Sequence, residues 1–405
     1  MAASDAQPRI PSAGLAVGER LQAIDVLRGL VILLMALDHV RDYFHNQVYL
    51  FDPLDLDQSY PLLYATRWIT HFCAPTFVFL SGVSAFLQSA KGKTGGALSR
   101  FLLTRGLWLV FLELTLVNFG WTFTPTGMVL IQVIWAIGWS MVALAGLVFL
   151  PRVAVLAIGV AIVAGHNLLD PIQAQSLGAW APVWYFLHQQ TPVMIGDQFV
   201  ALLAYPLLGW FGIMALGYGL GGIFIEPPAR RDRTLILLGA GMLALFVALR
   251  FGNFYGDPQP WTAQGDTARD VMAFFNVRKN PPSLMYVCAT LGTALLLFPA
   301  LARLPKTIAN FFAVFGCVPL FAYVLHLYVM HALAIGAAIA TGRDAGYLID
   351  PIRKMIFDAE AFAGTGFSLP VVYLFWLAVI AILYPLCVWF AGVKRTRRDW
   401  WLSYM

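Results

Sequence analysis

Long apolar segments recur along this 405-residue chain, and each is long enough to cross a lipid bilayer as a helix. A bilayer core requires about 20 predominantly apolar residues in helical form. Apolar residues make up 60% of the chain and Asp, Glu, Lys and Arg only 12%, about half the charge of a soluble domain. Backbone in lipid must satisfy its hydrogen bonds internally. We therefore predict an all-α fold, a polytopic transmembrane helical bundle.

The apolar pattern predicts about ten spans, with nine or eleven as alternatives because residues 308–315 could form an interfacial helix or a partial span. The expected spans are Ile24–Tyr43, Tyr64–Gln88, Leu98–Phe119, Val129–Leu150, Val153–Leu169, Asp197–Ile225, Thr234–Phe251, Ser283–Ala302, Phe315–Ala340 and Ser368–Ala391. We expect a flexible cytoplasmic segment at 1–22, one transmembrane domain at 23–393 and a basic cytoplasmic tail at 394–405.

The loop charges orient these spans. Sixteen Lys and Arg residues fall on the side of the N-terminus, nine on the other side, and Arg28 lies within a span. Basic residues collect in cytoplasmic loops because they resist translocation. Both termini are therefore predicted to be cytoplasmic. The net charge of +5 needs no nucleic-acid partner, and we expect none.

Ionisable residues within the first span are the strongest functional signal, because charges in a membrane are costly. Arg28 and His39 are eleven positions apart, which places them within about 20° of one helix face and roughly 16 Å apart. Asp25 joins this stripe. A structural explanation also exists: Asp25 and Arg28 could form an i,i+3 ion pair, and His39 could be a buried histidine bonded to a carbonyl.

Two further spans carry histidines that could meet His39. His71 enters the membrane from the outer side, close to Arg67, and could reach the depth of His39. His326 and His331 point about 140° apart on the ninth span, so only one can face the same cavity. We favour His326, with Tyr323 one turn earlier. His39 and His71, as two imidazoles at similar depth, could supply a general base and its orienting partner.

The outer loops offer candidate ligand contacts. The segment 252–282 mixes acidic residues with aromatic rings such as Trp261, which suits a sugar or another polyhydroxy ligand. Interfacial anchoring of these aromatics is an equally good explanation. Lys279 lies in a proline-rich turn, and Ser283 after it is expected to cap the eighth span.

Several segments together resemble a known family. They are Ile24–Gly29, Leu37–His39, Ala74–Gly82, Pro281–Ser283 and Pro319–His326. In this order they are similar to bacterial membrane proteins of the heparan-alpha-glucosaminide N-acetyltransferase catalytic-domain family. The stripe from Arg28 to His39 also resembles the first helix of membrane-bound sugar O-acyltransferases. The resemblance covers the chain from Arg20 to about His331.

The resemblance implies acyl transfer from cytoplasmic acyl-CoA to a sugar or other hydroxyl or amine acceptor beyond the membrane. Acetyl-CoA is the expected donor. Arg28, Arg100 and Arg105 would then hold the CoA phosphates, with Asp25 beside Arg28. His39 would deprotonate the acceptor or accept the acyl group itself. Ordinary cytoplasmic placement also explains Arg100 and Arg105.

The catalytic base remains open at this point. Lysosomal members of the family have asparagine at the position of His39, and their histidine lies in the loop before the second span. The candidates here are His39, His71 and His45, in that order. Asp38 could orient an imidazole on a neighbouring helix. Arg67, Tyr323, His326, Lys279 and Trp261 are the expected acceptor contacts.

Two other classes of protein use buried polar groups in this way. A carrier or flippase could use them as a relay, and a b-type cytochrome could use His39, His71 and His326 as axial ligands. We expect no metal or haem. The expected partners are acyl-CoA, a glycan or amino sugar and membrane lipids, and a homo-oligomer is compatible with the Gly-rich face at 217–222. A multi-pass protein of the bacterial inner membrane is expected.

Overall fold

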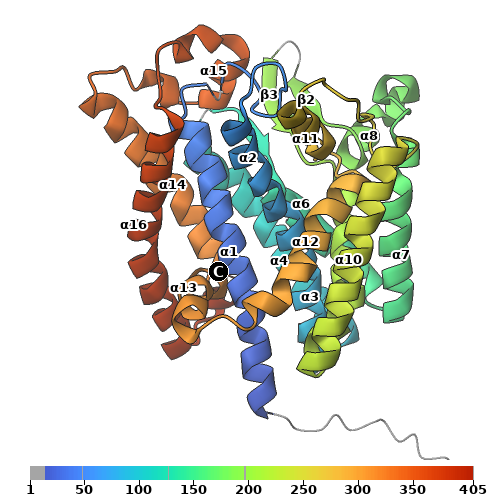
Figure 1. Ribbon diagram of the computed structural model, residues 1–405. Coiled ribbons are helices and arrows are strands. Elements are labelled where there is room, and N and C mark those ends of the chain that lie inside the picture. The colour runs from blue at the N-terminus through green and yellow to red at the C-terminus, as the bar shows by residue number, and fades with distance from the viewer. Residues whose placement is uncertain (1–13, 48, 126, 196–197, 405) are drawn as a thin grey trace, which may run out of the picture.

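The computed structural model describes residues 14–47, 49–125, 127–195 and 198–404. These are 74% helix and 4% strand, so the all-α prediction is confirmed. Among the described residues, eight helical stretches are long and apolar enough to cross a membrane. The chain is therefore a polytopic membrane bundle (Figure 1).

The helices of the bundle follow the predicted order. They are α1 (Gly14–Phe44), α2 (Pro61–Trp68), α3 (Cys73–Ala90), α4 (Gly95–Leu112), α5 (Asn118–Thr122), α6 (Val133–Leu147), α7 (Arg152–Gly165), α9 (Leu207–Leu220), α10 (Pro228–Gly252), α12 (Leu284–Leu301), α13 (Lys306–Cys317), α14 (Pro319–Ala340) and α16 (Leu369–Thr396). Short helices outside these are α8 (Ala181–Leu187), α11 (Thr267–Phe275) and α15 (Pro351–Phe357).

We call the end of the bundle where α1 begins the basal end, and the end that carries α8, α11 and α15 the apical end (Figure 1). A three-stranded sheet also lies at the apical end, with strand order β1 (Val129–Ile131), β3 (Gln198–Leu203), β2 (Thr191–Ile195). β1 and β3 are parallel, with Val129 opposite Ala201. β2 and β3 are antiparallel.

Two expected membrane spans are wrong at their starts, because those residues form strands of the sheet. Residues 198–203 were expected in a membrane helix but form β3, and the helix α9 begins only at Leu207. Asp197 lies outside the described residues. Likewise, 129–131 form β1, so α6 has only 15 residues. The β-branched and apolar residues of a short buried strand have the same composition as a membrane helix, so hydropathy alone could not separate them.

The expected span Phe315–Ala340 is also divided. α13 ends at Cys317 and α14 begins at Pro319, with Val318 in a non-helical conformation (φ −129°). Proline disfavours a helical conformation in the preceding residue, which explains the break. The uncertain stretch 308–315 lies within α13, a 12-residue helix that packs on α1.

Close backbone contacts hold α1 at the centre of the bundle. An added Cβ at Gly316 would lie 1.8 Å from the Asp25 carbonyl oxygen, and one at Gly29 would lie 1.9 Å from that of Phe312. The expected Gly-rich face at 217–222 packs within the chain, because a Cβ at Gly217 would lie 2.0 Å from the Phe79 carbonyl oxygen. Small residues thus permit close helix approach, as membrane bundles require.

Local signals in the sequence explain several helix starts. The Ser283 hydroxyl caps α12 by accepting from the Tyr286 backbone N–H at 3.1 Å, as predicted. Residues 1–13 of the segment expected to be flexible lie outside the described residues, and α1 starts at Gly14. At the other terminus, a 3₁₀ turn over Trp400–Tyr404 follows α16 and buries Leu402.

Candidate active site

A cavity of about 600 Å³ lies between α1, α3, α4, α6 and α14. Cationic side chains line its basal part, and apolar side chains together with Tyr323 line the remainder. The cations are Arg28, Lys91, Arg105 and Lys394. Such a cavity is large enough for a ligand of the size of a cofactor.

Arg28 borders this cavity and is positioned by two neighbours. Its guanidinium forms an ion pair with Asp25 at 3.0 Å, and it also donates to the Ser84 hydroxyl of α3. The ion pair that a structural explanation requires is therefore present. Arg28 and Met35 both line the cavity, so the predicted stripe of α1 faces it over about two helical turns.

His39 and His326 form a buried imidazole pair. The Nδ1 atom of His39 lies 2.7 Å from the Nε2 atom of His326, and the rings are stacked with centroids 5.0 Å apart. Trp121 contacts the His39 ring edge-on at 4.8 Å. One ring must donate and the other accept, because a neutral imidazole has one of each. The two rings are too close together to place a haem iron between them.

The pair lies next to the deep part of the cavity. Tyr323 lines the cavity, and its ring is 5.5 Å from that of His326, one turn later on α14. Met35 also lines the cavity, one turn before His39 on α1. Neither imidazole is itself a lining residue. The arrangement therefore places a titratable pair one helical turn beyond the cavity.

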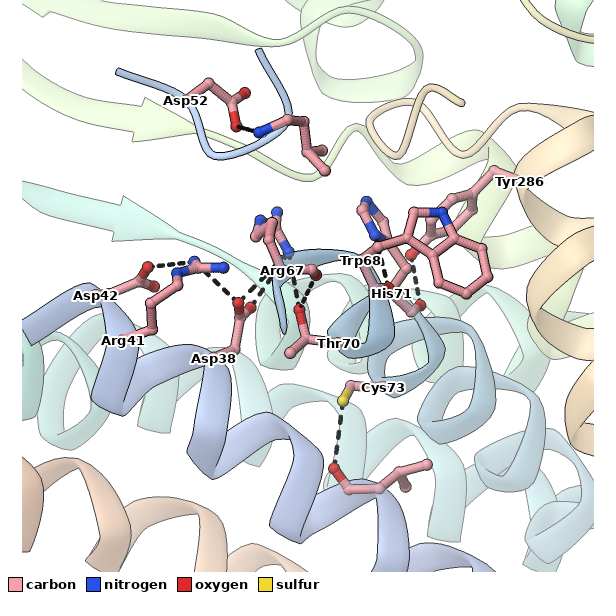
Figure 2. Close-up of polar contacts among 12 residues, drawn as sticks. Asp38, Arg41, Asp42, Asp52, Arg67, Trp68, Thr70, His71, Cys73 and Tyr286 are labelled. Atoms are coloured by element: carbon pink, nitrogen blue, oxygen red, sulfur yellow. Dashed lines mark hydrogen bonds and ion pairs between the residues drawn. The ribbon is translucent and has the colours of Figure 1, made fainter. Parts of the chain in front are cut away.

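A second cluster of polar side chains, formed by Asp38, Arg41, Asp42 and Arg67, lies toward the apical end of α1 (Figure 2). Asp38 forms an ion pair with Arg41 at 3.0 Å and accepts a hydrogen bond from Arg67 at 3.5 Å. Arg41 also contacts Asp42 at 2.5 Å, and Arg67 donates to Thr70 at 3.0 Å. Within the described residues, no hydrogen bond connects Asp38 to an imidazole. Asp38 is thus placed to hold the two guanidinium groups.

The expected pairing of His39 with His71 is wrong, because His326 occupies that position, and both His71 and His45 lie apart from the imidazole pair. His71 Nδ1 lies 3.0 Å from the Trp68 carbonyl oxygen, and the ring packs edge-on against Tyr286 (Figure 2). His45 follows α1, and its Nδ1 accepts from the Gln47 backbone N–H at 3.3 Å. Burial and the charge of Arg41 lower the pKa of His45 to about 4.

The remaining predicted residues are scattered. Arg100 is exposed and does not line the cavity, whereas Arg105 does and lies 4.5 Å from the Phe101 ring. Lys279 lies over the Tyr205 ring at 5.6 Å, near the polar cluster that contains Asp38. Trp261 packs against Phe251 and donates from its indole to the Asp270 carbonyl at 3.2 Å.

The sequence analysis missed two contributors to the cavity. Lys91 and Lys394 line it, but were counted only among the cytoplasmic charges. It also missed Glu113, a fully buried carboxylate in a π-helical turn, which accepts from the Gln132 backbone N–H at 3.0 Å. A π-helical turn often marks a functional segment, and a lone Glu within an apolar span was the available signal.

Membrane-length helices, buried ionisable groups and an internal cavity define the class: an integral membrane protein with a site inside its transmembrane domain. Residues 20–249, more than half of the chain, match the family described as heparan-alpha-glucosaminide N-acetyltransferase, catalytic. The chain belongs to this family, as the sequence motifs predicted. Membership implies acyltransferase activity at a membrane. No curated protein matches the chain.

Proposed function

We propose that this protein transfers an acyl group, most simply acetyl, from acyl-CoA at the basal end to a hydroxyl or amine acceptor, such as an amino sugar, at the apical end. The excess of basic residues in the basal loops supports a cytoplasmic position for that end. The observation that carries the proposal is the cavity, which combines cations near one end with an imidazole pair beyond the other.

The cations and the apolar side chains that line the cavity support acyl-CoA as the donor. Arg105, Lys91 and Lys394 can bind the phosphates of CoA, since cationic side chains form strong charge-assisted bonds to phosphate. Arg28 already holds Asp25 and Ser84, so it contributes a positioned charge. The apolar stretch through Met35 and Ile137 suits the pantetheine arm. The thioester would then approach Tyr323.

The imidazole pair supplies the proton transfer. In the proposed reaction, the acceptor O–H or N–H loses its proton to the pair as the acceptor attacks the thioester carbonyl. The acyl C–S bond breaks, an acyl C–O or C–N bond forms, and the CoA thiolate receives the proton. His39, at 9% exposed, is the member nearer to solvent, whereas His326 is fully buried and orients it.

The test uses the full-length protein in vesicles, with radiolabelled acetyl-CoA on the basal side and glucosamine on the other. We expect label in glucosamine, a loss of about 100-fold or more in His39→Ala, and a weaker loss in Arg28→Ala. His331→Gln is the control, because His331 is as fully buried on α14 as His326 but contacts the Gly120 and Leu348 carbonyls.

Two outcomes would contradict the proposal. Wild-type rates in His39→Ala would remove the imidazole pair from the mechanism. Movement of intact glucosamine across the vesicle membrane without acetyl-CoA would instead favour a carrier that uses the same buried charges as a relay.

A further inference from the structure

Three potential metal ligands converge at the apical end of α7, outside the proposed acyl-transfer cavity. His166 begins the 3₁₀ turn His166–Leu169 that follows α7, and Asp170 comes directly after it. His188 follows α8 and returns to the same place. One nitrogen of each imidazole and one oxygen of Asp170 all lie within 4.8 Å of one another.

Both imidazoles are buried, with His166 2% and His188 3% exposed. His166 Nε2 lies 2.9 Å from the Pro282 carbonyl oxygen, and His188 Nε2 lies 3.0 Å from the Asp170 carboxylate. Carbonyl and carboxylate oxygens accept hydrogen bonds, so both rings carry their proton on Nε2. Each Nδ1 is therefore left with a lone pair.

These lone pairs have no hydrogen-bond partner among the described residues. The Nδ1 atoms of His166 and His188 are both buried and unpaired. Buried polar atoms in native proteins are nearly always satisfied, and an unsatisfied one calls for a missing ligand, ion or water. Two imidazoles that converge with a carboxylate match the ligand preference of zinc.

An adjoining pocket offers space for a further ligand. It has a volume of about 220 Å³ and is lined by Asp170, His188, Arg278 and Asn280, among others. The Asn280 side-chain oxygen is buried and unpaired there. Three protein ligands and one open position are typical of reactive zinc sites. The Arg278 guanidinium favours an anion in that position.

We propose that His166, Asp170 and His188 bind a divalent transition-metal ion, with zinc as the best match, which replaces the hydrogen bond between His188 and Asp170 and leaves one coordination position open to this pocket. The ion would tie the segment that carries α8 to the end of α7. The site is separate from the imidazole pair of His39 and His326, so its failure would leave the proposed acyl transfer unaffected.

The test uses full-length protein purified through a streptavidin-binding tag, since a polyhistidine tag would bind metal itself. After treatment with a chelator, the protein is dialysed against zinc and its metal content measured by mass spectrometry. We expect one zinc per chain. Asp170→Asn and His188→Ala should each weaken zinc binding at least about 100-fold. Gln173→Ala, which changes the same pocket without removing a ligand atom, should retain wild-type binding.

Asp170→Asn keeps the size of the side chain, so it tests the site even if His188→Ala fails to fold. Cobalt in place of zinc should give a visible absorption spectrum, and azide should shift it by occupying the open position. Wild-type protein that binds no more zinc than Asp170→Asn would overturn the site. A cobalt spectrum that azide leaves unchanged would overturn the open position.

Discussion

At the scale of single residues, the charge of Asp38 has two partners. It lies 3.0 Å from the Arg41 guanidinium and 3.5 Å from that of Arg67, and Arg41 is only 3% exposed. Removal of one partner from a buried ion pair leaves an uncompensated charge, which costs about 3–5 kcal/mol.

We expect Asp38→Asn to lower the free energy of unfolding by about 3 kcal/mol, because Arg41 would keep only Asp42. Thermal unfolding in detergent measures this effect. Asp57→Asn is the matched control: Asp57 is 91% exposed and lies 3.9 Å from Arg269, so its loss should cost less than about 1 kcal/mol. Equal losses in both variants would contradict the assigned role of Asp38.

His45 predicts a dependence of stability on pH. Burial and the neighbouring Arg41 lower the pKa of His45 to about 4, below the value of about 6.5 in an unfolded chain. The unfolded chain therefore binds more protons between these values, so this contribution is complete above pH 6.5 and is lost as pH falls toward 4. This difference in pKa corresponds to a change of up to about 3 kcal/mol in the free energy of unfolding.

The measurement compares unfolding of the wild type and His45→Asn at pH 7 and pH 5. Asparagine keeps an acceptor for the Gln47 backbone N–H but does not titrate in this range. We expect the wild type to lose more stability than the variant on acidification. Parallel losses would assign the pH dependence to other groups.

Contacts between residues of the same helix were predictable from the sequence. The spacing of Asp25 and Arg28 implied their ion pair, and the angle between His326 and His331 implied that only one of these two could face the cavity of His39. Contacts between distant helices were not predictable. Nothing in the sequence indicates that Arg28 donates to Ser84. Nor does it indicate that Asp38 contacts Arg67, when an imidazole was the expected partner of Asp38.

At the scale of elements, the long spans could be predicted because hydropathy reports burial in lipid. The prediction Thr234–Phe251 lies within α10, and Ser368–Ala391 nearly coincides with the apolar part of α16. The strands could not be separated from helices, because a short apolar run has no distinguishing period. The pairing that stabilises β3 comes from β2, which directly precedes it in the sequence, and from β1, which is distant in the sequence.

The crossing of α1 and α13 depends on glycine. A Cβ at Gly316 would lie 1.8 Å from the Asp25 carbonyl oxygen, so Gly316→Ala must separate the two backbones. We expect it to destabilise the protein by about 2 kcal/mol or more, since overpacking typically costs about 1–3 kcal/mol. The shift would also disturb the Asp25–Arg28 ion pair beside the cavity.

Gly336→Ala in α14 is the matched control for this crossing. No atom lies within 4 Å of a Cβ at this position, so the change should be neutral or stabilising by about 0.5–1 kcal/mol. Thermal unfolding of both variants decides the question. A Gly316→Ala protein as stable as Gly336→Ala would show that α13 can move away from α1 without cost.

At the scale of the whole molecule, α1 and the segment that follows α16 meet around one cavity. Asp25 and Arg28 of α1 line it together with Lys394 of α16, and so do Leu402 and Tyr404 of the final turn. The segment 394–405 was expected to be a basic tail. Its cations were visible in the sequence, but its return to the bundle depends on tertiary contacts of Leu402.

The final turn has a consequence for donor binding. The Tyr404 ring lies 5.8 Å from the Arg105 guanidinium and 6.3 Å from the Trp108 ring, so it helps to hold Arg105 at the cavity. Cation–π contacts contribute about 0.5–2 kcal/mol. Deletion of residues 400–405 should therefore weaken binding of CoA about 3- to 10-fold, as measured by calorimetry on the full bundle in detergent.

The control for this deletion is Trp389→Ala, which removes an aromatic ring of α16 that is 61% exposed and does not line the cavity. It should leave CoA binding within about 2-fold of wild type. If the final turn is a wall of the donor site, deletion weakens binding because Arg105 loses its neighbour and water gains access. If deletion instead strengthens CoA binding, the same residues must occupy the space of the donor, and the turn would then act as a plug that the donor has to displace.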